Sequence, residues 1–257
     1  MIKTQAEAWA PLKNELEVWS QKGLEAQLWL RDDDAIEVTP ALEQLDDLCS
    51  QFNVPYTIAT IPSLTTQGLA QWAASHTLGH YAVHGFSHTN HAPSDEKKCE
   101  LGLHRGEQKI LDELAEGFEI LTNIFGAQMA PLLVPPWNRI DTALVPHLSA
   151  LGFKGLSTYG WPKPSKPHDL AIINTHIDII DWKGSRGGLP RKVLIDNLVE
   201  ALQTARALNP TQPPAIGVLS HHLVHDELAW NFLEELMSFS AKNNQIAWKS
   251  AKQIAQL

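Results

Sequence analysis

Short apolar runs alternate with amphipathic stretches along most of this chain of 257 residues. The apolar runs are rich in β-branched and aliphatic residues, and they cover residues 27–35, 56–60, 80–85, 131–136, 155–160, 171–180 and 215–222. Helical patterns separate most of these runs. One has Thr39 as its cap and Pro40 in its first turn, and a long one from about 104 to 125 ends at Gly126. This alternation predicts parallel strands joined by crossover helices.

One closed barrel of about seven strands fits this pattern better than two domains, because no internal repeat or low-complexity linker divides the chain. Proline-rich loops interrupt the pattern at residues 161–169 and 209–214. We therefore expect a single α/β domain over residues 1–257. Polar and aromatic residues fall at or just past the carboxyl ends of the runs, which is the edge where βα barrels build active sites. These residues are Asp33, Asp34, His84, Trp137, Asp178, Asp181 and His221.

Composition and charge narrow the classes of partner. Apolar residues make up 44% of the chain, which is enough for a globular core, and we interpret Cys49 and Cys99 as structural. The formal net charge of −9, without any run of Lys or Arg, argues against nucleic acid and anionic membranes and favours a neutral or cationic substrate. No segment reaches the ~18 apolar residues of a membrane span. Residues 1–19 lack the apolar core of a signal peptide, so we expect a cytoplasmic protein.

Two of the expected strand ends carry groups suited to binding a cation. Asp32, Asp33 and Asp34 follow the apolar Leu-Trp-Leu of the first run, where uncompensated charge would be expensive to bury. His84 and His88 lie four residues apart in HGFSH, and with one carboxylate they would leave positions open for water and substrate. Taken singly, the first segment could be a turn rich in Asp and the second a solvated loop.

Three further segments say little when each is taken by itself. They are VPPWNR (134–139), which could be only a rigid turn, DIIDW (178–182), and LSHHLVHD (219–226). We interpret Asp226 as the cap of a helix that begins near Glu227 rather than as a catalytic group. The order of all five segments along the chain is the specific signal.

In this order the chain resembles the polysaccharide deacetylases of the NodB-like carbohydrate esterase family 4. That family carries five motifs in sequence: a Thr-Phe-Asp-Asp-Gly, a His-Ser/Thr-x-x-His, an Arg-x-Pro-Tyr, an Asp-x-x-Asp-Trp and a Leu-x-Leu-x-His. Full or partial matches span residues 31–222, and HGFSH and DIIDW are the cleanest of them. The resemblance implies a distorted (β/α)7 barrel of the polysaccharide deacetylase type.

The resemblance also implies a metal site and a catalytic base. Matching RDDDA to the first motif makes Asp33 the base and Asp34 a metal ligand, with Asp32 left to support them. His84 and His88 would complete the ligand set, for which a divalent ion, zinc first, is expected. The register of the three acids stays open, because a shift by one residue would make Asp32 the base and Asp33 the ligand.

The later motifs supply the remaining roles. The backbone N–H of Trp137 would donate to the oxyanion, and His221 would be the general acid, oriented by Asp181. Trp182 would form a wall of the sugar groove, and Arg139, just after the third motif, is a further candidate for binding substrate.

This chain departs from the family pattern at two motif positions. The arginine of the third motif aligns with Val134, so Arg31, Arg139 or Arg186 would have to supply the charge that steadies the base. The glycine of the first motif is Ala35. Such changes leave room for a divergent member with a different substrate.

The expected function is therefore metal-dependent removal of an N-acyl group, acetyl first, from a small amino sugar or oligosaccharide. Trp137, Trp161 and Trp182 are candidates for stacking on sugar rings, although core packing is the alternative for each of them. Another amidohydrolase reaction on the same scaffold, such as deformylation or cyclic ureide opening, is one competing hypothesis. An inactive metal-binding protein that recognises sugar is the other, and the oligomeric state is not indicated.

Overall fold

The computed structural model describes residues 5–162 and 169–256, and the named strands of this part of the chain pair in parallel within one sheet. In chain order the strands are β1 (Ala26–Ala35), β2 (Tyr56–Thr60), β3 (Gly79–Val83), β4 (Met129–Leu133), β5 (Gly155–Leu156), β6 (Ala171–Ile172), β7 (Thr175–Asp178), β8 (Ile216–Ser220) and β9 (Ile246–Trp248). The order across the sheet is β6-β5-β4-β3-β2-β1-β8-β7, and β9 pairs with β1. All seven expected runs therefore contain strand.

The sixth apolar run, residues 171–180, forms two separate strands, and these two strands pair with opposite edges of the sheet so that the barrel closes. Its first half, β6, pairs with β5, whereas its second half, β7, pairs with β8. The chain after β5 then reaches β7, because Thr175 N–H donates to the carbonyl of Thr158 (3.0 Å) and Gly160 N–H donates to that of Thr175 (2.7 Å). Counting β6 and β7 as one strand gives the predicted distorted (β/α)7 barrel. The additional strand β9 was not predicted.

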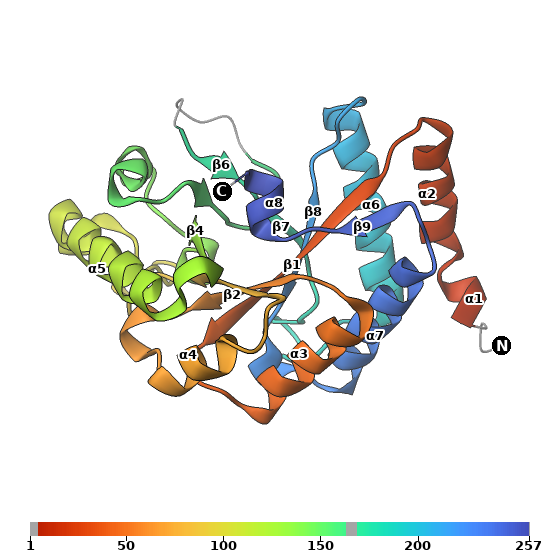
Figure 1. Ribbon diagram of the computed structural model, residues 1–257. Helices are drawn as coiled ribbons and strands as arrows, with labels where there is room; N and C mark the ends of the chain where they lie inside the picture. Colours follow the sequence, from red (N-terminus) through yellow and green to blue (C-terminus); the bar gives the residue numbers. More distant parts are fainter. Residues whose placement is uncertain (1–4, 163–168, 257) are drawn as a thin grey trace.

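Helices surround this sheet, as Figure 1 shows. They are α1 (Gln5–Ala8), α2 (Ala10–Gln21), α3 (Pro40–Phe52), α4 (Gln67–Ala73), α5 (Glu107–Phe125), α6 (Arg191–Leu208), α7 (Glu227–Ala241) and α8 (Ala251–Ala255). The single turns of 3-10 helix are η1 (Pro62–Leu64), η2 (Leu103–Arg105), η3 (Gly126–Gln128), η4 (Pro136–Asn138) and η6 (His222–Val224), and η5 (Val145–Leu151) is longer. The caps follow the sequence: Thr39 Oγ1 accepts from Leu42 N–H (3.1 Å) and Asp226 Oδ1 from Ala229 N–H (3.0 Å).

The strands separate two hydrophobic clusters, as their alternating side chains require. Leu28 and Leu30 of β1 pack outward in the large cluster that includes the helices. Trp29 belongs to a smaller cluster with alanines of β2, β3 and β4, which lies inside the barrel. Gly217 of β8 makes room there, because a Cβ at this position would lie 2.6 Å from Trp29 Nε1. The interior side of β1 thus carries Trp29, Arg31 and Asp33 in successive layers.

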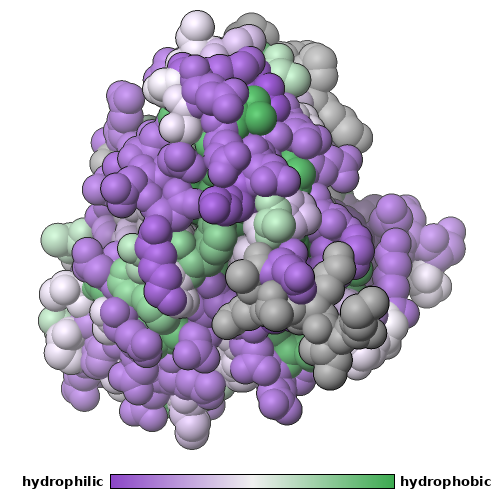
Figure 2. Space-filling model, turned by 90° about the vertical axis from the view of Figure 1, so that its right-hand side faces the viewer, coloured by the Kyte–Doolittle hydropathy of each residue, from purple (hydrophilic) through white to green (hydrophobic). Residues whose placement is uncertain are grey.

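The outside of the molecule is mainly hydrophilic on the face shown in Figure 2, where hydrophobic residues form only scattered patches. Among the described residues, no helix is both long enough and apolar enough to span a membrane. Both cysteines are free thiols, Cys49 buried and Cys99 partly buried.

Candidate metal centre and catalytic site

A β-bulge at the end of β1 aims two consecutive acids at the same end of the barrel. In a regular strand, neighbouring side chains point to opposite faces. Here the register with β2 shifts between Asp33 and Ala35, and Asp34 adopts a left-handed backbone conformation with φ 82°. The extra residue turns Asp34 back toward the barrel axis, beside Asp33.

Asp34, His84 and His88 form a compact cluster of possible metal ligands. His84 follows β3 directly, and His88 lies in the next turn with φ 54°. Asp34 Oδ1 lies 3.1 Å from His84 Nε2 and 3.2 Å from His88 Nε2, and the three ligand atoms lie within 4.8 Å of one another. This is the group of three such side chains that the described residues bring together, and it contains the three ligands expected from the sequence.

The spacing and chemistry of the cluster fit a zinc ion. Ligand bonds of ~2.0–2.2 Å in tetrahedral geometry place two donor atoms about 3.4 Å apart, close to the separations found here. His84 Nδ1 lies 2.9 Å from the carbonyl of Val134 and donates a proton to it, so Nε2, which faces Asp34, is the nitrogen that a metal would bind. A backbone carbonyl behind a ligand histidine is a common way of fixing its tautomer.

The electrostatics of the cluster keep Asp34 ionised. Burial alone would raise the pKa of Asp34, but the hydrogen bond and charge of His84, together with His88, outweigh burial and hold it well below its usual range. Burial also lowers the pKa of His88, and the nearby positive charge of His84 adds to that effect. A neutral His88 is the form that can donate a lone pair to a metal.

Glu100 holds the loop that carries His88, a role that the sequence did not indicate. Its buried carboxylate accepts from the N–H groups of Phe86 (3.3 Å) and Ser87 (2.8 Å). Gly85, at φ 62°, allows this close packing, because a Cβ there would lie 2.0 Å from Glu100 Oε2. Glu100 is far from the motif in sequence, so only the fold reveals the contact.

Arg31 is the arginine that contacts Asp33. It forms a two-pronged ion pair with Asp33, with Nε–Oδ1 and Nη2–Oδ2 distances of 2.9 Å. Its remaining N–H groups donate to Asn138 Oδ1 (2.7 Å) and Ser157 Oγ (2.8 Å), and its side chain is fully buried. Of the three arginines considered from the sequence, Arg31 is the one placed against Asp33.

His221 lies close to Asp33. Its Nε2 lies 4.0 Å from Asp33 Oδ2, and the edge of its ring contacts Trp182 at a centroid distance of 4.7 Å. His225 Nε2 accepts from the backbone N–H of His221 at 3.4 Å. Because burial lowers the pKa of His225 to about 4, its ring is neutral at pH 7 and can accept this bond.

Asp181 is placed differently from the role the resemblance suggested for it. Its carboxylate accepts from the backbone N–H groups of Gly184 (3.0 Å) and Ser185 (3.3 Å), so it stabilises the turn after β7. Asp178, like Asp33 and Asp34, interacts electrostatically with His221, and it also accepts from Trp182 Nε1 at 2.9 Å. Burial raises the pKa of Asp178. The geometry therefore favours Asp178 over Asp181 as the carboxylate that assists His221.

Asp32 points away from the metal cluster, as strand alternation requires. It is fully buried and contacts His222 Nδ1 closely, and it accepts from Ser220 Oγ (2.6 Å) and from the N–H of His222 (2.8 Å). These bonds tie the end of β1 to the end of β8. The geometry thus favours the register in which Asp33 and Asp34 serve the site and Asp32 supports them.

Of the residues in and next to the third motif, Trp137 lies at the metal-ligand cluster, whereas Arg139 lies outside it. Trp137 has φ 54°, and its ring contacts that of His88 at 4.4 Å. The turn bonds run from Asn138 and Arg139 N–H to Pro135 and Pro136, which leaves the N–H of Trp137 without a partner among the described residues. Arg139 donates to the carbonyl of Lys98 (2.7 Å) and lines a side cavity of about 470 Å³. Arg186 lies over the ring of Trp182, at 6.0 Å.

Comparison with solved structures identifies the fold. The chain is similar to a protein described as a polysaccharide deacetylase from Mycobacterium smegmatis, with a TM-score of 0.67, 16% identity and coverage of 91% of this chain and 90% of that one. It is also similar to a family 4 acetyl xylan esterase from Clostridium thermocellum in complex with a cobalt ion, with a TM-score of 0.55, 13% identity and 90% of each chain covered.

A third similar structure is the Bc1960 peptidoglycan N-acetylglucosamine deacetylase, with a TM-score of 0.54, 16% identity and coverage of 93% of this chain and 96% of that one. No protein-family model and no curated protein sequence matches the chain. The protein thus has the fold of the polysaccharide deacetylases, as its motifs predicted, and the likeness at these identities establishes the fold alone.

Proposed function

We propose that this protein is a metal-dependent hydrolase that removes an N-acyl group, acetyl first, from an amino sugar or a short oligosaccharide. The observation that carries the proposal is that Asp33 and His221, 4.0 Å apart, lie beside the Asp34–His84–His88 cluster at the carboxyl edge of the barrel. A proton acceptor, a proton donor and a metal site within one small volume are what hydrolysis of an amide requires.

The residues divide the work as follows. A zinc ion held by Asp34, His84 and His88 would lower the pKa of a water molecule and polarise the substrate carbonyl. Asp33, fixed by Arg31, accepts the proton of that water, and His221 returns a proton to the departing amine. The N–H of Trp137 is free to donate to the oxygen of the reacting carbonyl, where one such donor contributes roughly 10²–10³ in rate.

The substrate class follows from the surroundings of the cluster. Trp182 is 39% exposed beside His221 and offers an aromatic face to a sugar ring. The net charge of −9 favours a neutral or cationic substrate over nucleic acid. One of the similar structures is a peptidoglycan N-acetylglucosamine deacetylase, which supports an N-acetyl amino sugar as the first substrate to test. A cytoplasmic location stays a prediction and would favour a small glycoside over an insoluble polymer.

The experiment is a measurement of acetate release from N-acetylglucosamine oligosaccharides by zinc-loaded protein. The same panel includes N-formyl sugars and cyclic ureides, which test the competing amidohydrolase reactions. Asp33→Asn abolishes turnover on this proposal, whereas Asp112→Asn, on the exposed side of α5, does not. Turnover of none of these compounds by the metal-loaded parent, or full turnover by Asp33→Asn, contradicts the proposal.

A further inference from the structure

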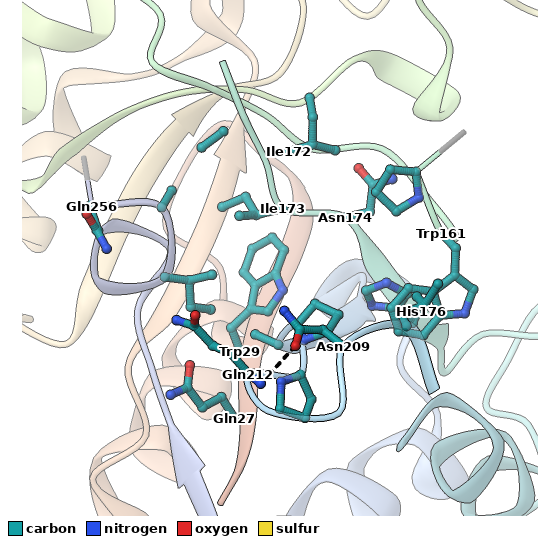
Figure 3. Close-up of a pocket in the computed structure, with 18 residues that line it drawn as sticks. Gln27, Trp29, Trp161, Ile172, Ile173, Asn174, His176, Asn209, Gln212 and Gln256 are labelled. Atoms are coloured by element: carbon teal, nitrogen blue, oxygen red, sulfur yellow. Dashed lines mark hydrogen bonds between the residues drawn. The ribbon is translucent and has the colours of Figure 1, made fainter. Parts of the chain in front are cut away.

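A cavity lies away from the metal centre, at the end of the barrel where β1 and β8 begin. It has a volume of about 650 Å³, within the ~300–1,000 Å³ typical of small-molecule sites. Its walls come from the start of β1, the segment between β6 and β7, the loop after α6, and α8 (Figure 3). Trp29 and Asp33 are four residues apart on one strand, so the cavity and the catalytic base are separated by roughly 13 Å.

The lining of this cavity contains no Asp, Glu, Lys or Arg among the described residues. Its titratable side chain is His176, and burial lowers the pKa of that imidazole to about 4, so it is neutral at pH 7. A charged ligand that gave up its hydration here would find no countercharge, and such an unpaired charge is expensive to bury. The described part of the lining therefore favours an uncharged ligand.

Several polar groups of the lining remain available to a ligand. His176 Nδ1 accepts from Gly217 N–H at 3.1 Å, so the ring proton is on Nε2, which is buried and has no partner among the described residues. Between the labelled lining residues of Figure 3, one hydrogen bond is drawn, from Gln212 N–H to Asn209 Oδ1. The side-chain amides of Gln27 and Gln212 line the opening, and each offers both donors and an acceptor.

Aromatic rings supply the rest of the surface. Trp161 packs against His176 with ring centroids 4.0 Å apart, and Trp29 forms the buried floor. Trp161 was a candidate for stacking on sugar from the sequence, and the structure places it at this cavity rather than at the metal centre. Flat apolar faces combined with neutral donors and acceptors complement a ring that has hydroxyl groups on its edge and C–H groups on its faces.

We propose that this cavity is a second binding site, distinct from the catalytic one, for a short neutral saccharide. The ring of the saccharide lies against Trp161 over the floor formed by Trp29. Its hydroxyl groups exchange hydrogen bonds with the amides of Gln27 and Gln212. An apolar aromatic compound is the competing occupant; it would contact Trp161 and Trp29 but make no use of the amides of Gln27 and Gln212.

The test is direct binding, measured by calorimetry and by saturation-transfer NMR. The probes are cellobiose and maltose, which lack an N-acyl group, together with glucuronic acid, glucosamine and indole. We expect a neutral disaccharide to bind and the two charged sugars not to bind. We expect Trp161→Ala and Gln212→Ala each to weaken this binding at least tenfold, and Gln108→Ala, the matched control away from the cavity, to leave it unchanged.

Gln212 is exposed in a loop, so its replacement tests the site without a risk to folding. The proposal is overturned if no neutral disaccharide binds at about 10 mM, if indole binds and the disaccharides do not, or if binding survives Gln212→Ala. Because the readout is binding of compounds that cannot be deacylated, its failure would leave the proposed hydrolysis at the metal centre intact.

Discussion

Replacing Arg31 by Met is the most informative single change in this protein, because Arg31 links Asp33, the proposed base, to the barrel interior. The guanidinium is fully buried, and its partner Asp33 is 2% exposed. The change removes both prongs of the ion pair and the bonds to Asn138 and Ser157, and it leaves a buried carboxylate without a countercharge. Breaking a buried pair in this way costs about 3–5 kcal/mol.

In a protein of this size, that loss lowers the melting temperature by about 6–20 °C. The assay is reversible unfolding in guanidinium chloride, with the thermal midpoint as a second measure. A double replacement, Arg31→Met with Asp33→Asn, removes both charges together. We expect it to be less destabilising than the sum of the two single changes by about 1–3 kcal/mol, because neither charge is then left unpaired.

The matched control is Arg191→Met on α6. Arg191 also pairs with a carboxylate, that of Glu235, at 2.9 Å, but the two side chains are 40% and 21% exposed. Pairs exposed to solvent contribute about 0–1 kcal/mol, so this change is expected to have little effect. If Arg31→Met costs no more than Arg191→Met, or if the double variant shows simple additivity, the structural reasoning about Arg31 is wrong.

Three further outcomes are expected. Elemental analysis after purification without chelator is expected to find about one zinc per chain in the parent and in the surface variant His147→Ala, and to find that His84→Ala has lost its zinc. If His84→Ala keeps its zinc, the metal is bound elsewhere. Asp33→Asn and His221→Ala each keep the metal and lose at least roughly 10² in turnover, and near-full activity in either refutes its assigned role. Burial lowers the pKa of His176 from its ordinary 6.5 to about 4. Between these two pH values the unfolded chain binds more protons than the folded protein, so the free energy of unfolding falls as pH falls, by up to roughly 3 kcal/mol. If the unfolding midpoint depends on pH between 4 and 7 as steeply in His176→Gln as in the parent, this reasoning is wrong.

The parts of the fold that follow from local sequence were predictable. Apolar runs with helical patterns between them gave the seven strand segments, and Thr39 and Asp226 marked helix starts because their side chains can accept the first free N–H groups. The split between β6 and β7 depends instead on Thr158 and Thr175, which bond only when the barrel closes. The three-residue strand β9 is too short to give a periodic pattern and is fixed by its pairing with β1.

The candidate site shows the same division between local and tertiary information. The three metal-ligand positions could be named because two motifs keep their spacing in the sequence. From the sequence, Arg31 was one of three arginines that could pair with Asp33. The family motif places its arginine at position 134, where this chain has Val134. Side chains two residues apart on a strand point to the same face of the sheet. Arg31 and Asp33 both point into the barrel interior, where they are close enough to form an ion pair.

The bulge at Asp34 allows one more test, in which an ordinary preference should reverse. In the middle of a strand, Gly is less stable than Ala by roughly 0.5–1 kcal/mol because it loses more backbone entropy on folding. At φ 82° a Cβ is strained, at a cost of about 1–3 kcal/mol, whereas Gly adopts this conformation freely. Asp34→Gly and Asp34→Ala both remove the carboxylate and its contacts with His84 and His88, so they differ only in the Cβ. We expect Asp34→Gly to be the more stable of the two by about 1 kcal/mol in guanidinium unfolding with chelator present. An Ala variant as stable as the Gly variant would mean that β1 continues without the bulge, and Asp33 and Asp34 could then not serve one site.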